Sequence, residues 1–151
     1  WWAPLLTKIG QLDRLKISQI IFNNTNERNK LEQFIYPRII ETQNGHIECA
    51  QGLSDIKAIV LDCPLLFEHH LDKQCNVIVF IEAELNDRLD RVVSIRGWTA
   101  EEFNKRENAQ MSLKNKKERS HFIIDNPAGE LNKLKQKVEK MLDFLRDRDI
   151  E

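Results

Sequence analysis

The chain has 151 residues, 41% of them hydrophobic and 31% charged, and its formal net charge is −1. That length suits one domain with one core, and the composition is ordinary for a globular protein. The near-neutral charge gives no bulk attraction to nucleic acid or to anionic membranes. No apolar run approaches the roughly 20 residues that span a bilayer, and no signal peptide is recognisable. We therefore expect no nucleic-acid partner and no membrane association.

The cysteines and histidines do not form a recognisable ligand set. The cysteines are Cys49, Cys63 and Cys75, an odd number without C-x-x-C spacing, which argues against a disulfide framework and against a zinc site. His69 and His70 are adjacent, so they point in different directions on any regular element. The sequence indicates reduced thiols in a cytoplasmic protein and no bound metal at these residues.

The first third of the chain predicts helices. Residues 11–22 place apolar side chains among polar ones, which is typical of a short amphipathic helix. A second helix is expected to begin near Asn24, because Asn24 and Glu27 have the spacing of a capping box. That helix is expected to end or kink at Tyr36-Pro37, since proline disfavours helical geometry at the preceding residue. Residues 43–55 contain two glycines and are predicted to form a loop.

The rest of the chain predicts alternating strands and helices. Short apolar runs at residues 58–61, 77–81 and 122–124 are typical of strands that are buried on both faces. Helical periodicity fills residues 84–95, a T-x-x-E motif at Thr99 starts the next helix, and a last helix starts near Glu130. This order predicts an α/β protein with a parallel sheet.

The segment "VLDCPLLFE", residues 60–68, follows the first of these runs. Ligands of parallel α/β sheets bind at the carboxyl ends of the strands, which is where this segment is expected to lie. Glu68 could accept a hydrogen bond or orient a substrate group there. The alternative is that Leu65, Leu66 and Phe67 only cover the end of the sheet, with Glu68 in solvent. Residue types leave both possibilities open.

Basic residues concentrate in the next segments. Arg88 and Arg91 are three apart and are expected to share the polar face of one helix, and Arg106 and Gln110 are four apart on another. Residues 105–119 hold six basic and two acidic side chains. Arginine forks match the charge that develops on phosphoryl oxygens during transfer. The alternative is a solvated helix pair with salt bridges between successive turns.

Two further observations concern nucleotide binding. The segment "DNPAGE", residues 125–130, could present the Asn126 amide or its backbone to a base, but residue types alone favour plain turn chemistry. None of the five glycines lies in G-x-x-x-x-G-K-[ST] or G-x-G-x-x-G. No loop of this sequence can therefore wrap a triphosphate with successive backbone amides.

Several segments, taken together, resemble the dephospho-CoA kinase family from about Gln11 to Leu145. They are "LDRLKISQIIF", "ERNKLEQFIYPRI", "IVLDCPLLFE" and "IRGWTAEEFNKRENAQMSLKNKKERSHFIIDN", in that order. The resemblance implies an α/β, P-loop kinase-like three-layer parallel sheet, here lacking its first strands, with a helical substrate region and a lid. It implies that ATP and Mg²⁺ are used to phosphorylate the ribose 3′-hydroxyl of dephospho-CoA, the last step of coenzyme A synthesis. The implied regions are a helical dephospho-CoA-binding region at 1–50, a core at 51–87 and 121–151, and a lid with its supports at 88–120.

The resemblance also assigns roles to residues. The positions implied to stabilise phosphate in the lid are Arg91, Arg96 and Arg106. Those implied to bind ATP are Arg106, Gln110 and Asn126. Those implied to bind dephospho-CoA are Arg14, Tyr36, Arg38, Pro64, Leu65, Leu66, Phe67 and Glu68. Two positions depart from the family, which usually has His before Pro37 and often has Asp after Arg96.

The family begins with a P-loop and a second strand that carries an Asp thought to act as general base, and this sequence contains neither. We expect an N-terminal truncation of roughly 50 to 70 residues, judged by the size of a P-loop and βαβ unit. The Mg²⁺ ligands are then expected mostly in the missing part. The 151-residue chain alone is expected to be inactive and unstable, because unpaired strand edges promote aggregation.

The partners implied are the small molecules ATP and dephospho-CoA, in a monomer or weak homo-oligomer. Two alternatives remain open for the function. One is another P-loop nucleoside or nucleotide kinase that has the same lid. The other is a non-catalytic remnant that binds dephospho-CoA. A nucleic-acid binder that uses residues 105–119 is disfavoured, because that segment has little aromatic interleaving.

Overall fold

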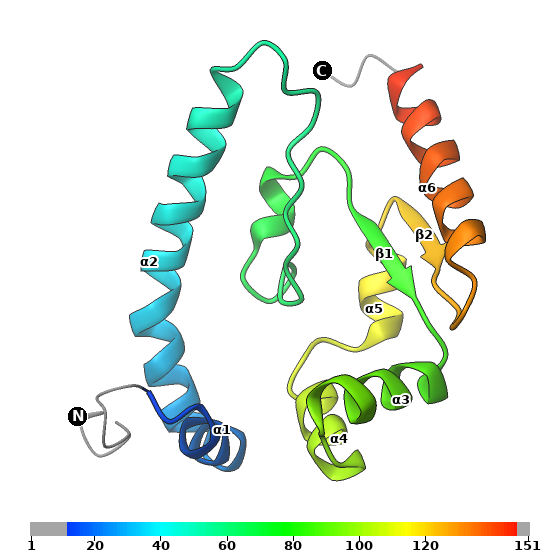
Figure 1. Ribbon diagram of the computed structural model, residues 1–151. Helices are drawn as coiled ribbons and strands as arrows, with labels where there is room; N and C mark the ends of the chain where they lie inside the picture. The colour runs from blue at the N-terminus through cyan, green and yellow to red at the C-terminus, as the bar shows by residue number, and fades with distance from the viewer. Residues whose placement is uncertain (1–11, 148–151) are drawn as a thin grey trace. The chain divides into compact units, whose positions relative to one another are not determined.

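The computed structural model describes residues 12–147, and this part of the chain divides into two compact units that separate after Asp62. The first unit is helical, and the second combines helices with a parallel sheet (Figure 1). The predicted α/β class is confirmed. Residues 1–11 and 148–151, which belong to the predicted terminal regions, lie outside the described residues.

The first unit contains α1 (Arg14–Asn23) and α2 (Thr25–Gln51), which pack against each other. Both helices begin at a side-chain cap. Asp13 Oδ1 accepts a hydrogen bond from the Lys16 N–H at 3.1 Å, and Asn24 Oδ1 accepts from the N–H groups of Asn26 and Glu27 at 3.0 and 3.2 Å. Such caps satisfy amide donors that have no partner inside the helix. The predicted helix start at Asn24 is confirmed, and the first helix begins at Arg14, within the predicted residues 11–22.

Helix α2 does not end at Pro37, which was one of the two expected outcomes, and it continues through Gly45 to Gln51. Proline removes one amide donor and disturbs the preceding turn. Next to the proline, Arg38 Nη1 donates to the Phe34 carbonyl oxygen at 2.7 Å, and the Arg38 guanidinium carbon lies 4.1 Å from the Phe34 ring centroid. The loop predicted for residues 43–55 was therefore wrong over its helical part.

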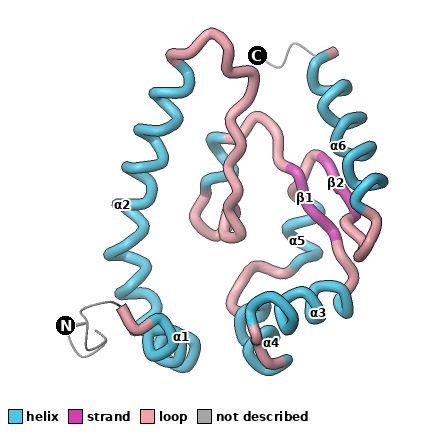
Figure 2. The backbone as a smooth tube through the Cα atoms, viewed as in Figure 1, coloured by secondary structure: helices cyan, strands magenta, loops and turns pink. Residues whose placement is uncertain are grey.

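The sheet of the second unit has two parallel strands, β1 (Val79–Glu82) and β2 (Phe122–Asp125), paired from Val79↔Phe122 to Glu82↔Asp125 (Figure 2). Both strands were predicted, with small shifts of their bounds. Parallel neighbours need a long crossover. It is provided by α3 (Leu85–Arg96), α4 (Ala100–Asn108) and α5 (Leu113–Glu118). Helix α6 (Leu131–Arg146) then packs on β2, with the rings of Phe122 and Phe144 edge to face at 5.5 Å.

The third predicted strand is absent. Residues 58–61 have no regular secondary structure and pair with no strand among residues 12–147. Val60 is 85% exposed. An apolar run becomes a sheet strand only where a neighbouring edge can satisfy its backbone groups. Among the described residues this run has no paired strand, although β1 and β2 each pair on one side only.

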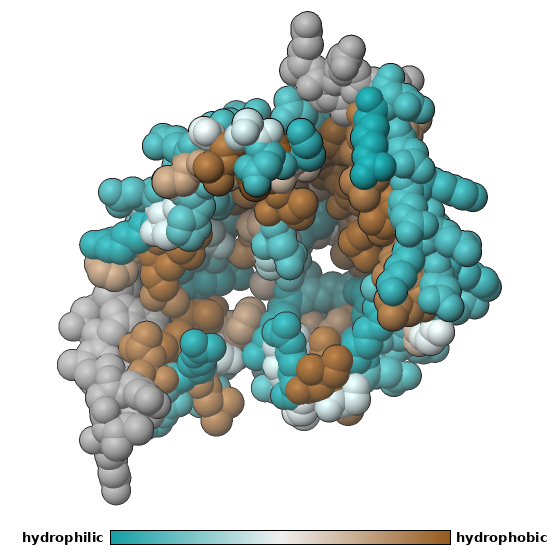
Figure 3. Space-filling model, turned by 45° about the horizontal axis from the view of Figure 1, so that its top comes forward, coloured by the Kyte–Doolittle hydropathy of each residue, from teal (hydrophilic) through white to brown (hydrophobic). Residues whose placement is uncertain are grey.

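The core of the described residues lies in the second unit. Its buried apolar side chains are Phe67, Leu71, Ile78, Phe103 and Ile124. Many other large apolar side chains stay at the surface, where Figure 3 shows them as brown areas among hydrophilic ones. Within residues 12–147, no helix combines the length and the hydropathy required to cross a bilayer.

Candidate functional site

A lysine that the sequence analysis did not single out lies at the centre of the second unit's polar contacts. Lys116, on α5, is the only buried charged side chain among the described residues. Its Nζ donates to the Pro64 carbonyl oxygen at 2.7 Å and to Gln110 Oε1 at 2.9 Å, and it forms an ion pair with Glu68 Oε1 at 2.9 Å. An ammonium has three N–H donors, and each is matched here by one acceptor. Lys116 therefore connects the 64–68 turn, the α4–α5 connection and α5.

Glu68 makes contacts within the protein, whereas one of the two interpretations placed its side chain in solvent. Its Oε1 accepts the Met111 N–H at 2.7 Å as well as pairing with Lys116. Burial alone would raise the pKa of Glu68, but the Lys116 ammonium and the Met111 N–H outweigh it and hold the pKa below its ordinary value. Glu68 Oε2 is buried without a hydrogen-bond partner. The carboxylate thus holds residues 64–68 against the α4–α5 connection.

The aromatic ring of the same turn is engaged as well. Phe67 is buried, and the Arg119 guanidinium lies 4.3 Å from its ring centroid. Arg119 Nη2 also pairs with Asp72 Oδ2 at 2.7 Å, and Asp72 belongs to the 3₁₀ helix η2 (Leu71–Gln74). Two side chains of the basic segment, Lys116 and Arg119, therefore hold residues 64–72 in place.

Two of the predicted lid arginines lie on one indole ring. The guanidinium carbons of Arg96 and Arg106 lie 5.3 and 4.0 Å from the Trp98 ring centroid. Gly97 ends α3 with φ at +65°, a conformation that glycine adopts without strain. Arginine is attracted to the face of an indole. The stack concentrates positive charge at the junction of α3 and α4, and Trp98 is a residue that the sequence analysis missed.

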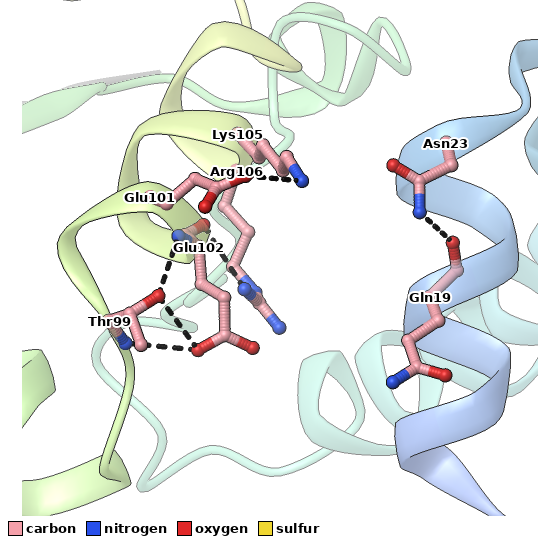
Figure 4. A network of polar contacts seen from close by, with 7 residues as sticks. All are labelled: Gln19, Asn23, Thr99, Glu101, Glu102, Lys105 and Arg106. Atoms are coloured by element: carbon pink, nitrogen blue, oxygen red, sulfur yellow. Dashed lines mark hydrogen bonds and ion pairs between the residues drawn. The ribbon is translucent and has the colours of Figure 1, made fainter.

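The start of α4 supports this junction, as Figure 4 shows. The Thr99 N–H donates to Glu102 Oε2 at 3.0 Å, and the Glu102 N–H donates to Thr99 Oγ1 at 3.2 Å, which completes the predicted capping box. Arg106 Nη1 donates to the Glu102 carbonyl oxygen at 3.1 Å, and Lys105 pairs with Glu101 at 2.9 Å.

The other arginines of α3 anchor that helix to its surroundings. Arg91 Nη2 donates to the Asn126 carbonyl oxygen at 2.6 Å, and the Asn126 N–H donates to the Glu82 carbonyl oxygen at 2.7 Å. Arg88 donates to the Ala83 carbonyl oxygen at 3.1 Å and to Glu107 at 2.7 Å. Two predicted site residues, Arg91 and Asn126, are therefore in direct contact beside the carboxyl ends of both strands.

Gln110 lies outside the helix that carries Arg106, so the prediction that both share one helical face was wrong. Helix α4 ends at Asn108, and α5 begins only after Ser112, whose hydroxyl accepts the Asn115 N–H at 3.3 Å. A serine that caps a new helix interrupts the old one. Gln110 occupies the connection, where its amide oxygen contacts Lys116.

Acidic side chains at the carboxyl ends of the strands are neutralised by lysines. Glu82 and Asp125 lie opposite each other in the sheet, and they pair with Lys117 and Lys137 respectively. The hydrogen bond from Lys137 is the main cause that lowers the pKa of Asp125. Across residues 12–147, no group of three or more His, Cys, Asp and Glu side chains gathers as a metal site would require. The described residues therefore form no cluster that would hold a metal ion by side chains alone.

The three predicted substrate residues of the first unit lie on both of its helices. Arg14 is exposed in the first turn of α1, and Tyr36 and Arg38 lie on α2. One stripe of α2 borders an open hollow of about 480 Å³, and its side chains are Ile35, Arg38, Ile39, Thr42, Gln43 and His46. The hollow therefore combines a cation with aliphatic side chains.

A family model described as dephospho-CoA kinase matches residues 2–132. The chain belongs to the dephospho-CoA kinase family. A dephospho-CoA kinase from Arabidopsis thaliana is 34% identical over 94% of this chain and 60% of its own length. One from Latilactobacillus sakei is 30% identical over 91% of this chain and 67% of its own length. A solved structure from Thermus thermophilus matches with a TM-score of 0.73 at 25% identity, over 95% of this chain and 72% of that one.

The chain thus spans 60% of the length of the Arabidopsis dephospho-CoA kinase. The family prediction from the quoted segments is confirmed. The roles of individual residues stay predictions, because family membership does not test them one by one.

Proposed function

We propose that this chain takes part in the ATP-dependent phosphorylation of the ribose 3′-hydroxyl of dephospho-CoA, which gives coenzyme A. Membership of the dephospho-CoA kinase family supports the proposal. The observation that carries it is the pair of guanidiniums from Arg96 and Arg106 on the Trp98 ring. Phosphoryl transfer is catalysed mainly by positioning and by cations that compensate charge on the phosphoryl oxygens.

On the donor side, Arg96 and Arg106 would contact the phosphates of ATP, and Gln110 would add a neutral donor. During transfer the ribose oxygen forms a bond to the γ-phosphorus while the bond to the ADP oxygen breaks. Charge that spreads over the transferred oxygens is stabilised by arginine forks. Arg91 holds the backbone of Asn126, so that the loop after β2 is fixed where the nucleotide base is expected. This division of roles is our assignment.

On the acceptor side, we assign Arg14, Tyr36, Arg38 and residues 64–68 to dephospho-CoA. The hollow on α2 places the Arg38 cation beside Ile35 and Ile39. That mixture suits an acceptor that carries both phosphates and a long uncharged arm. Glu68 is held by Lys116 and Met111, so it would orient the neighbouring turn rather than take up the acceptor's proton.

The finer properties belong to the same proposal. We propose Mg²⁺ as the counter-ion of ATP, a cytoplasmic location, and a monomer or weak homo-oligomer without nucleic-acid or membrane partners. The ATP phosphates would hold the ion together with ligands expected mostly outside the described residues.

The test is a transfer assay on the protein expressed from its full open reading frame. ATP and dephospho-CoA should give coenzyme A, detected by mass, and nucleoside monophosphates should be poor acceptors. Arg106→Ala should lower kcat about 100-fold or more, as the loss of a transition-state donor does. Lys114→Met is the control, because Lys114 is exposed and its distance to Glu118 is 3.9 Å.

The outcomes separate the alternatives. Preferred transfer to nucleoside monophosphates would replace the acceptor assignment with another nucleotide kinase. Binding of dephospho-CoA without any transfer would favour the non-catalytic remnant.

A further inference from the structure

We propose that Lys116 is a positioning residue that fixes the orientation of the Gln110 side-chain amide, so that Gln110 offers its NH₂ group to the phosphates of the donor nucleotide. This inference rests on the function proposed above. The first observation is that the Lys116 side chain is buried, whereas those of the neighbouring lysines are not. The Lys116 side chain is 9% exposed, whereas that of Lys114 on the same helix is 82% exposed.

The chemistry of the contact sets the orientation of the amide. An ammonium donates hydrogen bonds and accepts none, so the atom that faces Lys116 Nζ at 2.9 Å must be the amide oxygen. The Nε2 group of Gln110 then points away from Lys116. Among residues 12–147 it donates to no other residue, and it is not buried. Gln110 therefore has two amide hydrogens available as donors, and an anionic ligand requires donors.

Lys116 does not bind phosphate itself. Its three N–H donors are occupied by the Pro64 carbonyl, Gln110 Oε1 and Glu68 Oε1, and the Glu68 carboxylate cancels its charge. A buried ammonium with one carboxylate and two neutral oxygens around it is fully satisfied. Its effect on a ligand must pass through the groups that it holds. Lys116 therefore differs in role from the other basic residues of the segment, which reach solvent.

The same ammonium joins the predicted donor and acceptor elements. Pro64 and Glu68 belong to the turn assigned to dephospho-CoA, and Gln110 to the connection assigned to ATP. A side chain that is locked by packing and satisfied hydrogen bonds can hold a binding group to the precision that catalysis needs. Without Lys116, the Gln110 amide could rotate, and part of the ATP affinity would be lost to its ordering.

The test is a double-mutant cycle on the protein expressed from its full open reading frame. Lys116→Met and Gln110→Ala should each raise KM for ATP about tenfold, the loss expected for a hydrogen bond to a charged group. The double variant should be no worse than Gln110→Ala alone, because Lys116 acts through Gln110. Lys114→Met removes the same charge from the same helix, and it should leave KM for ATP unchanged with or without Gln110→Ala.

Folding is controlled separately, because Lys116→Met leaves the Glu68 carboxylate without its cation. Lys116→Met/Glu68→Gln removes that charge as well, and the cycle is repeated with Glu68→Gln as its reference if the single variant melts early. The inference would be overturned if the double variant raised KM for ATP by the product of the two single effects. It would also be overturned if folded Lys116→Met had an unchanged KM for ATP. In both cases the kinase function stands. A wild type that forms no coenzyme A would remove the proposed function, and this inference with it.

Discussion

The two carboxylate oxygens of Glu68 have unequal surroundings. Oε1 meets Lys116 and the Met111 N–H, and Oε2 is buried without a partner. The sequence offered a choice between an orienting glutamate and a solvated one, and it could not decide, because a glutamate after an apolar turn fits both. The partners that decide it are 43 and 48 residues further along the chain, at Met111 and Lys116.

The lowered pKa of Glu68 predicts an acid-sensitive contribution to stability. Its folded pKa lies below the ordinary value of 4.5, so the stabilisation is complete above that value and is lost as the pH falls through the folded pKa. Glu68→Gln should lower the free energy of unfolding at neutral pH by about 1–3 kcal/mol. Urea titrations from about pH 6 to about pH 3 should show a smaller decline for the variant than for the wild type. Equal declines would show that Glu68 is not the group responsible.

Trp98 should matter through the arginines that it supports. Trp98→Ala removes a surface that contacts the guanidiniums of Arg96 and Arg106, each contact worth about 0.5–2 kcal/mol. We expect kcat/KM for ATP to fall about tenfold or more, and Trp98→Phe to retain part of the activity, because phenylalanine keeps an aromatic face. A Trp98→Ala enzyme with unchanged kcat/KM for ATP would contradict this role.

Residues such as Lys116 and Trp98 could not be found from the sequence. Lys116 stands in a basic run in which every lysine has the same local pattern, and only the fold shows that this one is buried. Trp98 follows Arg96-Gly97, and that spacing could have suggested a stacked pair. However, its contact with Arg106 depends on the turn at Gly97 and on the register of α4.

Strand β2 has one buried and one exposed apolar side chain in adjacent positions. Ile124 is 3% exposed and Ile123 is 48% exposed, because neighbouring residues of a strand point to opposite faces. Ile124→Ala should lower the free energy of unfolding by about 2–5 kcal/mol, as measured by denaturant titration. Ile123→Ala is the matched control and should cost less than about 1 kcal/mol. Similar losses of unfolding free energy at both positions would contradict the assignment of the core to the face of β2 that carries Ile124.

The elements that the sequence predicted correctly carry local signals. Asn24 and Thr99 cap their helices as expected. The apolar runs near residues 79–82 and 122–125 form two strands that pair in parallel. The failures are those in which a remote partner or a single side chain overrides the local signal. The run at 58–61 pairs with no strand among the described residues, and α2 continues past Pro37, where the Arg38 side chain bonds the Phe34 carbonyl.

The two compact units differ in how much core they contain. Every buried apolar side chain among residues 12–147 belongs to the second unit, and neither α1 nor α2 contains a buried residue. Helix α1 has 10 residues, a length at which an isolated helix is marginal in water, and most helical stability in proteins comes from tertiary packing. The first unit is therefore predicted to have little stability of its own.

The expected consequence is weak cooperativity when the 151-residue chain is studied alone. Far-UV circular dichroism should show helix lost over a broad temperature range, and this loss should not coincide with the change of the near-UV signal. One sharp transition that both signals share, at micromolar concentration without aggregation, would contradict this prediction and the expected instability of the chain. The family resemblance implied the boundaries of the regions. It contained no information on how well the side chains of each region are packed.

The burial of Lys116 also has a chemical consequence. Reagents that acylate amines attack the exposed lysines of α5, of which Lys114 is one, whereas Lys116 holds its nitrogen inside a closed set of oxygens. Lys116 becomes modified only in molecules in which α5 has moved away from residues 64–68. The yield of acylated Lys116, read by mass spectrometry, therefore counts how often these two segments separate in solution.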